Sequence, residues 1–300
     1  MSPARQRIAA IDVGSNTVLL TVAEYDPEVG LVVIEEAEDQ PRLGAGLSAT
    51  GRLSEEATLR ALASLTRMRD TCRRHGVERL EAVATAAVRE AANGTDFVAR
   101  ARNLGIPLRI LAPEIEAALS YKSAAHHFPD RRRTLVADIG GGSVEVVGAA
   151  GGRVRLSRSL PLGAVRLTER HFPLDELQDR IRQELTRALP DEWRGSAVVG
   201  SGGTFTTLAG IASARRRAAT GPVHGVVVET SEVRQLLPWL AAMDRLQRRQ
   251  VPGLRPERAD IIVAGLAVAL QLLETVDAGG VTVSGFGLRD GLLLEMAGVA

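Results

Sequence analysis

Two loops that combine aspartate, glycine and hydroxyl residues carry the clearest chemical signal in this chain. The first reads Asp12-Val13-Gly14-Ser15-Asn16-Thr17, and the second reads Asp138-Ile139-Gly140-Gly141-Gly142-Ser143. Each follows an apolar run and precedes a second β-like run. A glycine turn between two strands exposes successive backbone N–H groups, and such concave nests bind phosphate oxygens. An aspartate at the strand end can then hold Mg²⁺ or a water beside that phosphate.

The repetition of this device matters more than either copy. One Asp-x-Gly hairpin is ordinarily a simple tight turn, but two copies with the same flanking strands indicate a duplicated unit with two half-sites for one phosphate chain. We therefore expect phosphate to be bound by two sets of loop residues. These are Ser15, Asn16 and Thr17 in the first loop, and Gly140, Gly141, Gly142 and Ser143 in the second.

The composition is that of a globular protein without a dominant charge. The 300 residues are 45% hydrophobic and 24% charged, and the formal net charge is +1, so no global field favours nucleic acid or a membrane as partner. A single cysteine, Cys72, excludes a disulfide framework and a cysteine zinc site. The longest apolar stretch, 261–273, is too short to span a bilayer, and no signal peptide opens the sequence. We expect a cytoplasmic protein.

The elements around the two loops repeat in the same order. Three strand-like runs, a long helical stretch over 54–75 and further helix and strand signals lead up to about residue 126. The pattern then restarts with strand signals at 134–138, 143–148 and 154–160. This repeat predicts two similar α/β domains, residues 1–125 and 126–300, each with a phosphate loop. Since no long linker separates them, the two are expected to share a tight cleft.

Nine motifs in this order resemble the exopolyphosphatase and guanosine-pentaphosphate phosphohydrolase (Ppx/GppA) family, which belongs to the actin, sugar-kinase and heat-shock ATPase superfamily. The motifs are 12–17, 42–47, 85–93, 114–117, 138–145, 160–167, 200–204, 256–260 and 284–291. The resemblance implies two ribonuclease-H-like domains that face a central cleft. It also implies a hydrolase that removes the terminal phosphate of inorganic polyphosphate or of guanosine pentaphosphate.

Three carboxylates and one arginine acquire roles from this resemblance. Asp138 and Glu145 are expected to help hold Mg²⁺ and the reacting water, and strand alternation places Glu145 on the same face as Ser143. Glu116 lies in the first turns of a helix opened by a proline, and it matches the family's water-activating carboxylate. Arg89 is expected to clamp the phosphates of the substrate.

A third glycine-rich segment is a further candidate for binding anions. Gly202 and Gly203 end a strand signal and begin a helical one, and a helix N-terminus favours negative charge. In ATP-binding relatives the corresponding loop approaches adenosine, but here it is expected to face the phosphate chain.

Two departures from the family pattern leave alternatives open. Ala112-Pro113 and Ala86 stand where the family often has a hydroxyl residue that could touch phosphate. Because the carboxylates and both loops are present, an enzyme with polyphosphate as substrate is the favoured interpretation. Guanosine pentaphosphate as substrate, a sugar kinase or ATPase, and a non-catalytic polyphosphate or alarmone sensor are the alternatives, and a homodimer is possible.

Overall fold

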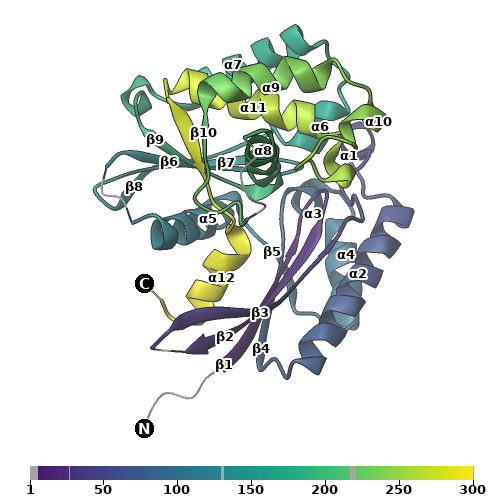
Figure 1. The fold of residues 1–300 in the computed structure, drawn as a ribbon. Helices are drawn as coiled ribbons and strands as arrows, with labels where there is room; N and C mark the ends of the chain where they lie inside the picture. The colour runs from purple at the N-terminus through teal and green to yellow at the C-terminus, as the bar shows by residue number, and fades with distance from the viewer. Residues whose placement is uncertain (1–5, 27, 130–131, 217–220, 300) are drawn as a thin grey trace. The chain divides into compact units, whose positions relative to one another are not determined.

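The computed structural model describes residues 6–26, 28–129, 132–216 and 221–299 of the chain. It divides into two compact units, which Figure 1 draws as a ribbon. Unit 1 comprises Met1–Ser123 and Leu288–Ala300, and unit 2 comprises Ala124–Gly287. Each unit contains one mixed sheet with its own helices.

The sheet of unit 1 has five strands in the order β3-β2-β1-β4-β5. Their bounds are β1 Gln6–Val13, β2 Val18–Asp26, β3 Gly30–Asp39, β4 Arg79–Ala84 and β5 Leu108–Ile110. Strands β1 to β3 form an antiparallel meander, whereas β4 runs parallel to β1 and β5 parallel to β4. The first loop is therefore the tight connection between β1 and β2.

Helices cover both faces of this sheet. They are α1 (Leu47–Thr50), α2 (Glu55–Arg74), α3 (Ala86–Glu90), α4 (Gly94–Asn103), the first part of α5 (Pro113–His127) and α12 (Leu288–Met296). Because side chains alternate along a strand, Ala9 and Ile11 of β1 join the core beneath α2 and α4. Ile8 and Ala10 join a second core with Leu292 of α12.

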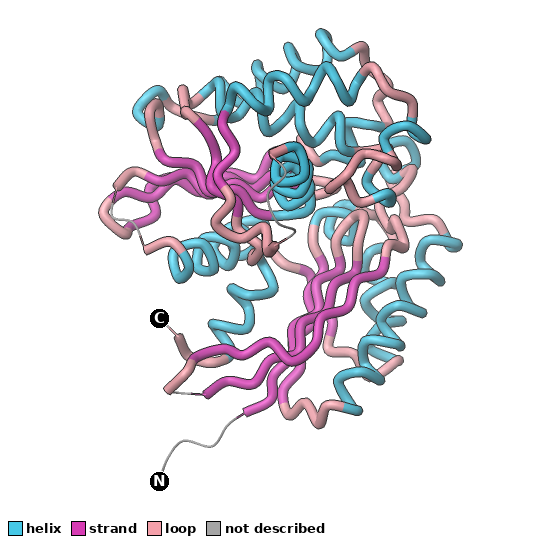
Figure 2. Tube along the Cα trace, in the orientation of Figure 1, coloured by secondary structure: helices cyan, strands magenta, loops and turns pink. Residues whose placement is uncertain are grey.

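Unit 2 repeats the strand order and extends it. Its sheet runs β10-β11-β9-β6-β7-β8. The strands are β6 Thr134–Ile139, β7 Val144–Ala150, β8 Arg153–Leu160, β9 Ala197–Ser201, β10 Val227–Glu229 and β11 Gly280–Val283. Strands β8-β7-β6-β9 follow the same antiparallel and parallel pattern as β3-β2-β1-β4, and the second loop is the connection between β6 and β7. Figure 2 shows the strands of each unit in magenta.

The helices of unit 2 pack around one central apolar helix. They are α6 (Ala164–Thr168), α7 (Leu174–Ala188), α8 (Gly202–Arg215), α9 (Thr230–Ala241), α10 (Arg245–Arg248) and α11 (Ile262–Thr275), with short 3₁₀ turns η1 (Asp191–Trp193) and η2 (Pro256–Arg258). Helix α11 contacts α6, α7, α8 and α9, and nearly all its residues are buried. No helix in the described residues has the length and apolarity to cross a bilayer.

The predicted fold class of two similar α/β units of the ribonuclease-H-like type is confirmed. One part of the predicted division is wrong, because it assigned all of 126–300 to a second domain. Helix α12 instead belongs to unit 1, where Leu288, Leu292 and Met296 pack with Ile8 and other residues of the sheet. The short elements α1, α3, α10 and β10 were also not predicted, since three to five residues carry too little periodicity.

Candidate active site

The two loops have the same internal hydrogen bond. In the first, the N–H of Gly14 donates to the carbonyl of Thr17 at 2.9 Å, and in the second the N–H of Gly140 donates to that of Ser143 at 3.1 Å. Within the described residues, the N–H groups of Ser15 and Asn16, and those of Gly141 and Gly142, donate no backbone hydrogen bond in a turn or loop. Both loops therefore offer successive amides of the kind that bind anions.

The carbonyl groups of both loops are instead held by a supporting segment. In unit 1, Gly44 N–H donates to Ser15 at 2.8 Å and Arg42 N–H donates to Asn16 at 3.1 Å. In unit 2, the first residues of α6 bind the loop carbonyls in the same way. The N–H of Ala164 donates to the carbonyl of Gly140 and the N–H of Val165 to that of Gly141, both at 2.9 Å. Since the carbonyl oxygens are bound on one side, the loops keep a fixed shape.

The side chain of Asn16 adds a donor to the first loop. Asn16 is 5% exposed, and within the described residues its Nδ2 is buried with no hydrogen-bond partner. A buried amide nitrogen without an acceptor costs free energy, so a ligand oxygen or a water that accepts from it would be stabilising. Ser15 and Thr17 are buried beside it. The three predicted residues of the first loop thus lie together.

Four polar residues form a row across the sheet of unit 2. Asp138 on β6 pairs in register with Glu145 on β7 and with Ser201 on β9, and Glu145 pairs with Ser159 on β8. Ser201 Oγ donates to Asp138 Oδ2 at 2.8 Å, and Ser159 Oγ donates to Glu145 Oε1 at 2.8 Å. Directly opposed residues of an antiparallel pair share a face, with Cβ atoms about 5 Å apart. The structure therefore brings together the two carboxylates predicted as metal ligands.

The carboxyl group of Asp138 lies in a tight pocket of glycine backbone. A Cβ on Gly202 would lie 2.5 Å from Asp138 Oδ1, and one on Gly287 would lie 3.4 Å from Oδ2. Burial raises the pKa of Asp138 above its usual value, while the Ser201 hydroxyl and the charge of Arg258 act in the opposite direction. A cation near Asp138 would favour its charged form in the same way as Arg258 does.

The first turn of α8 lies against the guanidinium of Arg258. A Cβ built on Gly203 would be 1.9 Å from Cζ of Arg258, so only glycine allows the guanidinium to come this close to the helix N-terminus. Both features favour an anion, because the first amides of a helix and a guanidinium carry positive charge. Gly202 and Gly203 thus lie at the start of a helix, as predicted, and the structure adds that Gly202 lies beside Asp138.

Glu116 and Arg89 are brought together in unit 1. Arg89 follows β4 on the short helix α3, and its Nη1 donates to Glu116 Oε2 at 2.8 Å and to the carbonyl of Leu111 at 2.9 Å. Their side chains are only 19% and 9% exposed. Arg89 was predicted to clamp phosphate; what the structure shows is a hydrogen bond from Arg89 to the carboxylate predicted to activate water.

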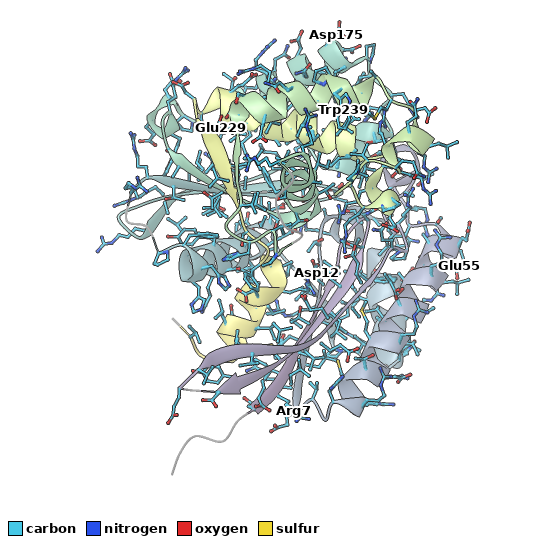
Figure 3. The ribbon with its side chains drawn as sticks, viewed as in Figure 1. Arg7, Asp12, Glu55, Asp175, Glu229 and Trp239 are labelled. Carbon is cyan, nitrogen blue, oxygen red and sulfur yellow. The ribbon has the colours of Figure 1, made fainter. Side chains whose placement is uncertain are left out.

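The aspartate of the first loop is also placed at a strand end, near an arginine. Figure 3 labels Asp12 at the end of β1, whereas Glu55 projects from the outer side of α2. Burial lowers the pKa of Arg289 of α12, and the negative charges of Glu36 and Asp12 act in the opposite direction. Arg289 Nη1 donates to the carbonyl of Leu20 at 2.8 Å and to Thr21 Oγ1 at 2.7 Å. Each loop aspartate thus interacts electrostatically with an arginine from a distant part of its own unit, Asp12 with Arg289 and Asp138 with Arg258.

Comparison with known protein families identifies the family of this chain. Residues 21–299 match the model of the Ppx/GppA phosphatase family. The chain belongs to this family.

Solved structures of other members extend the similarity over the whole chain. A Ppx/GppA family member from Aquifex aeolicus is 30% identical, with 98% of each chain covered and a TM-score of 0.82. An exopolyphosphatase from Cytophaga hutchinsonii is 27% identical, with 98% of this chain and 99% of that chain covered and a TM-score of 0.91. An exopolyphosphatase-like protein is 25% identical with a TM-score of 0.89.

Several residues of the candidate site were not predicted from the sequence. Ser201 and Ser159 hold the two carboxylates, Arg258 lies at Asp138, and Arg166 Nε donates to the carbonyl of Gly142 at 2.8 Å. Arg166, Ser201 and Arg258 fall inside motifs that carried the family resemblance, so the motifs could have suggested them. Nothing local marks Ser159, because its role depends on the register between β7 and β8.

Proposed function

We propose that the chain is an exopolyphosphatase, which releases the terminal orthophosphate of inorganic polyphosphate by attack of water. The observation that carries this proposal is a loop in each unit with the same closing hydrogen bond and with two successive amides that donate no backbone hydrogen bond within the described residues. Amides of this kind bind phosphate oxygens, and inorganic polyphosphate is a chain of phosphate groups alone. A solved relative described as an exopolyphosphatase supports the same substrate.

The residues of unit 2 fit a magnesium ion. The described part of the chain contains no cluster of three or more metal-binding side chains. Mg²⁺, however, is commonly held by one or two carboxylates together with substrate phosphates and water. Asp138 and Glu145 would be those carboxylates, and when bound the ion would neutralise charge on the phosphate oxygens.

The chain's own groups have separate parts in the reaction. The amides of Gly141 and Gly142 bind phosphate oxygens, and the start of α8 with Arg258 binds further negative charge. Glu116, held by Arg89, accepts a proton from water as the water oxygen forms a bond to the terminal phosphorus. The bridging P–O bond breaks, and the shortened chain leaves with the electron pair. Positioning and electrostatics supply most of the rate in such transfers.

Guanosine pentaphosphate is the second candidate substrate, because release of its terminal phosphate would require the same reaction by the same residues. One experiment separates the possibilities: phosphate release from polyphosphate, guanosine pentaphosphate and ATP, each with and without Mg²⁺. The proposal expects the highest kcat/KM with polyphosphate and little activity with ATP. A preference for guanosine pentaphosphate would change the substrate, and a preference for ATP would indicate a kinase-like or ATPase function. Binding of polyphosphate without hydrolysis would indicate a sensor.

A further inference from the structure

Arg42 has a backbone conformation that arginine rarely adopts. Its φ is +54°, in the left-handed region that favours glycine. The other described non-glycine residues with positive φ, His171 and Asp277, each follow the end of a helix, α6 or α11, where this conformation is common. Arg42 instead lies between β3 and α1. Arginine costs conformational free energy here that glycine would not, and such strain is typical of functional positions.

The backbone of Arg42 belongs to the segment that supports the first loop. Its N–H donates to the carbonyl of Asn16 at 3.1 Å, and a Cβ on the neighbouring Gly44 would lie 2.9 Å from Cβ of Ser15. The side chain of Arg42 therefore begins beside the two residues whose amides are suited to binding an anion. A guanidinium is the side-chain group whose planar set of donors best matches phosphate oxygens.

The second loop has an arginine in the equivalent place. Arg166 lies in α6, which supports this loop. Its N–H donates to the carbonyl of Gly141 at 3.2 Å, and its Nε donates to the carbonyl of Gly142 at 2.8 Å. Both Arg42 and Arg166 are only partly exposed. One supporting segment is irregular and the other is a helix, so what the two share is an arginine beside a phosphate loop.

We propose that Arg42 and Arg166 are phosphate-binding residues, one for each loop. The loop amides bind oxygens of a phosphate group, and the guanidinium adds a full positive charge and further N–H donors at the same place. Backbone amides carry only partial charges, so they compensate the negative charge of a phosphate incompletely. This inference rests on the proposed function, because it takes phosphate groups as the ligand of each loop.

Equilibrium binding tests the role of Arg42 without turnover. The full chain is titrated by calorimetry, without Mg²⁺, with inorganic polyphosphate of one defined chain length. Arg42→Gly removes the guanidinium and also relieves the strained φ. The variant should therefore melt close to the wild-type temperature or above it, while its affinity for polyphosphate falls about tenfold. The loss should shrink as ionic strength rises, because salt screens the interaction between charges.

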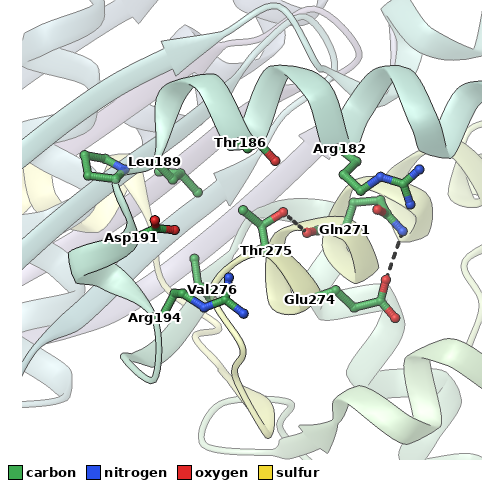
Figure 4. A pocket seen from close by; sticks show the side chains of 10 residues that line it. Arg182, Thr186, Leu189, Asp191, Arg194, Gln271, Glu274, Thr275 and Val276 are labelled. Atoms are coloured by element: carbon green, nitrogen blue, oxygen red, sulfur yellow. Dashed lines mark hydrogen bonds between the residues drawn. The ribbon is translucent and has the colours of Figure 1, made fainter.

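Asp277→Gly is the matched control, because it introduces glycine at almost the same φ, +51°. Figure 4 shows the preceding residue, Val276, in the lining of a cavity among α7, η1 and α11. Ile261, just before α11, packs with Val165 of α6. Asp277 follows the other end of α11, about 20 Å away along the helix. This variant should also melt close to the wild-type temperature or above it, but it should bind polyphosphate like the wild type.

Arg166→Ala tests the second loop and should likewise weaken binding about tenfold. Its control is Arg170→Ala, which removes an exposed arginine just after α6. If Arg166→Ala does not fold, Arg166→Gln takes its place.

The inference is overturned if Arg42→Gly or the folded Arg166 variant binds polyphosphate like the wild type. It is also overturned if Arg42→Gly melts well below both the wild type and Asp277→Gly, which would indicate a structural role. A wild type that binds polyphosphate without hydrolysing it in the presence of Mg²⁺ would contradict the proposed function and leave this inference intact. A wild type that binds no polyphosphate would overturn both.

Discussion

Arg89 and Glu116 form a buried ion pair in which one guanidinium nitrogen also holds the carbonyl of Leu111. Removing one partner of a buried pair leaves the other charge uncompensated. The carboxylate of Glu116 therefore has one preferred position, which a water-activating group requires. We therefore predict that Arg89 acts as a positioning residue for Glu116.

We predict that Glu116→Gln lowers kcat by about 10²–10⁴ while polyphosphate binding stays close to that of the wild type, because the amide cannot accept a proton from water. Arg89→Lys should also lower kcat, because lysine cannot hold Glu116 and Leu111 in the same geometry. The loss should be smaller than that in Glu116→Gln. Steady-state kinetics of both single variants and of the double variant provide the measurement. If Arg89 acts through Glu116, Arg89→Lys has little further effect on kcat in the Glu116→Gln background. Wild-type turnover of Glu116→Gln would disprove its role.

We predict that Asp138→Asn and Glu145→Ala each move the Mg²⁺ activation curve to higher concentration and lower the maximal rate. Both carboxylates lie on one face of adjacent strands, and carboxylates are the protein ligands that Mg²⁺ prefers. The assay is phosphate release from polyphosphate over a Mg²⁺ titration. Ser159→Ala is the matched control, because it removes the hydroxyl that supports Glu145 and leaves both carboxylates; its shift should be smaller. Unchanged activation curves in both carboxylate variants would place the metal elsewhere.

A third prediction concerns Arg258. Arg258→Ala should raise KM for polyphosphate by about tenfold, since it removes a positive charge at the N-terminus of α8 beside Asp138. Arg258→Lys keeps the positive charge but not the planar guanidinium, so its KM should lie between that of the wild type and that of Arg258→Ala. The effect should shrink as ionic strength rises, because salt screens contacts between charges. An equal KM for wild type and Arg258→Ala at low salt would rule this contact out.

Local signals in the sequence were enough to predict most elements. Helix α2 begins after Ser54, whose Oγ accepts from Ala57 N–H at 3.2 Å, and Gly76 follows its end with φ +63°. Even the pairing of Asp138 with Glu145 follows from a hairpin that turns at the second glycine loop.

Contacts between distant segments could not be predicted in this way. Helix α12 joins unit 1 through apolar contacts with strands more than 200 residues away in the sequence, and no local pattern distinguishes them from contacts within unit 2. Likewise, Ser201 reaches Asp138 through the parallel pairing of β9 with β6, and the register of that pair has no signature in either strand.

The single cysteine provides a prediction on pH. Burial raises the pKa of the Cys72 thiol to about 11, from 9.0 for a free thiol. The folded state therefore favours the protonated form, and this contribution to stability is complete below pH 9 and lost as the pH rises toward 11. We expect unfolding midpoints to fall over this range in the wild type and to fall less in Cys72→Ala. Cys72 should also resist alkylation at pH 8 until the protein unfolds. Rapid labelling of the folded protein would contradict the buried position.

The last prediction tests whether the supporting segments set the shape of the two loops. A Cβ on Gly163 would lie 2.3 Å from the carbonyl oxygen of Gly141, and one on Gly44 would lie 2.9 Å from Cβ of Ser15. The first clash is with backbone, so Gly163→Ala should displace the second loop, whereas Gly44→Ala should press on the first loop less severely. We expect both to weaken polyphosphate binding, Gly163→Ala by about tenfold or more, since misaligned amides no longer converge on one phosphate. Gly279→Ala is the matched control, because a Cβ there meets nothing within 4 Å. Circular dichroism would establish that the variants fold, and equal affinity of folded Gly163→Ala and Gly279→Ala would show that the second loop does not hold the substrate.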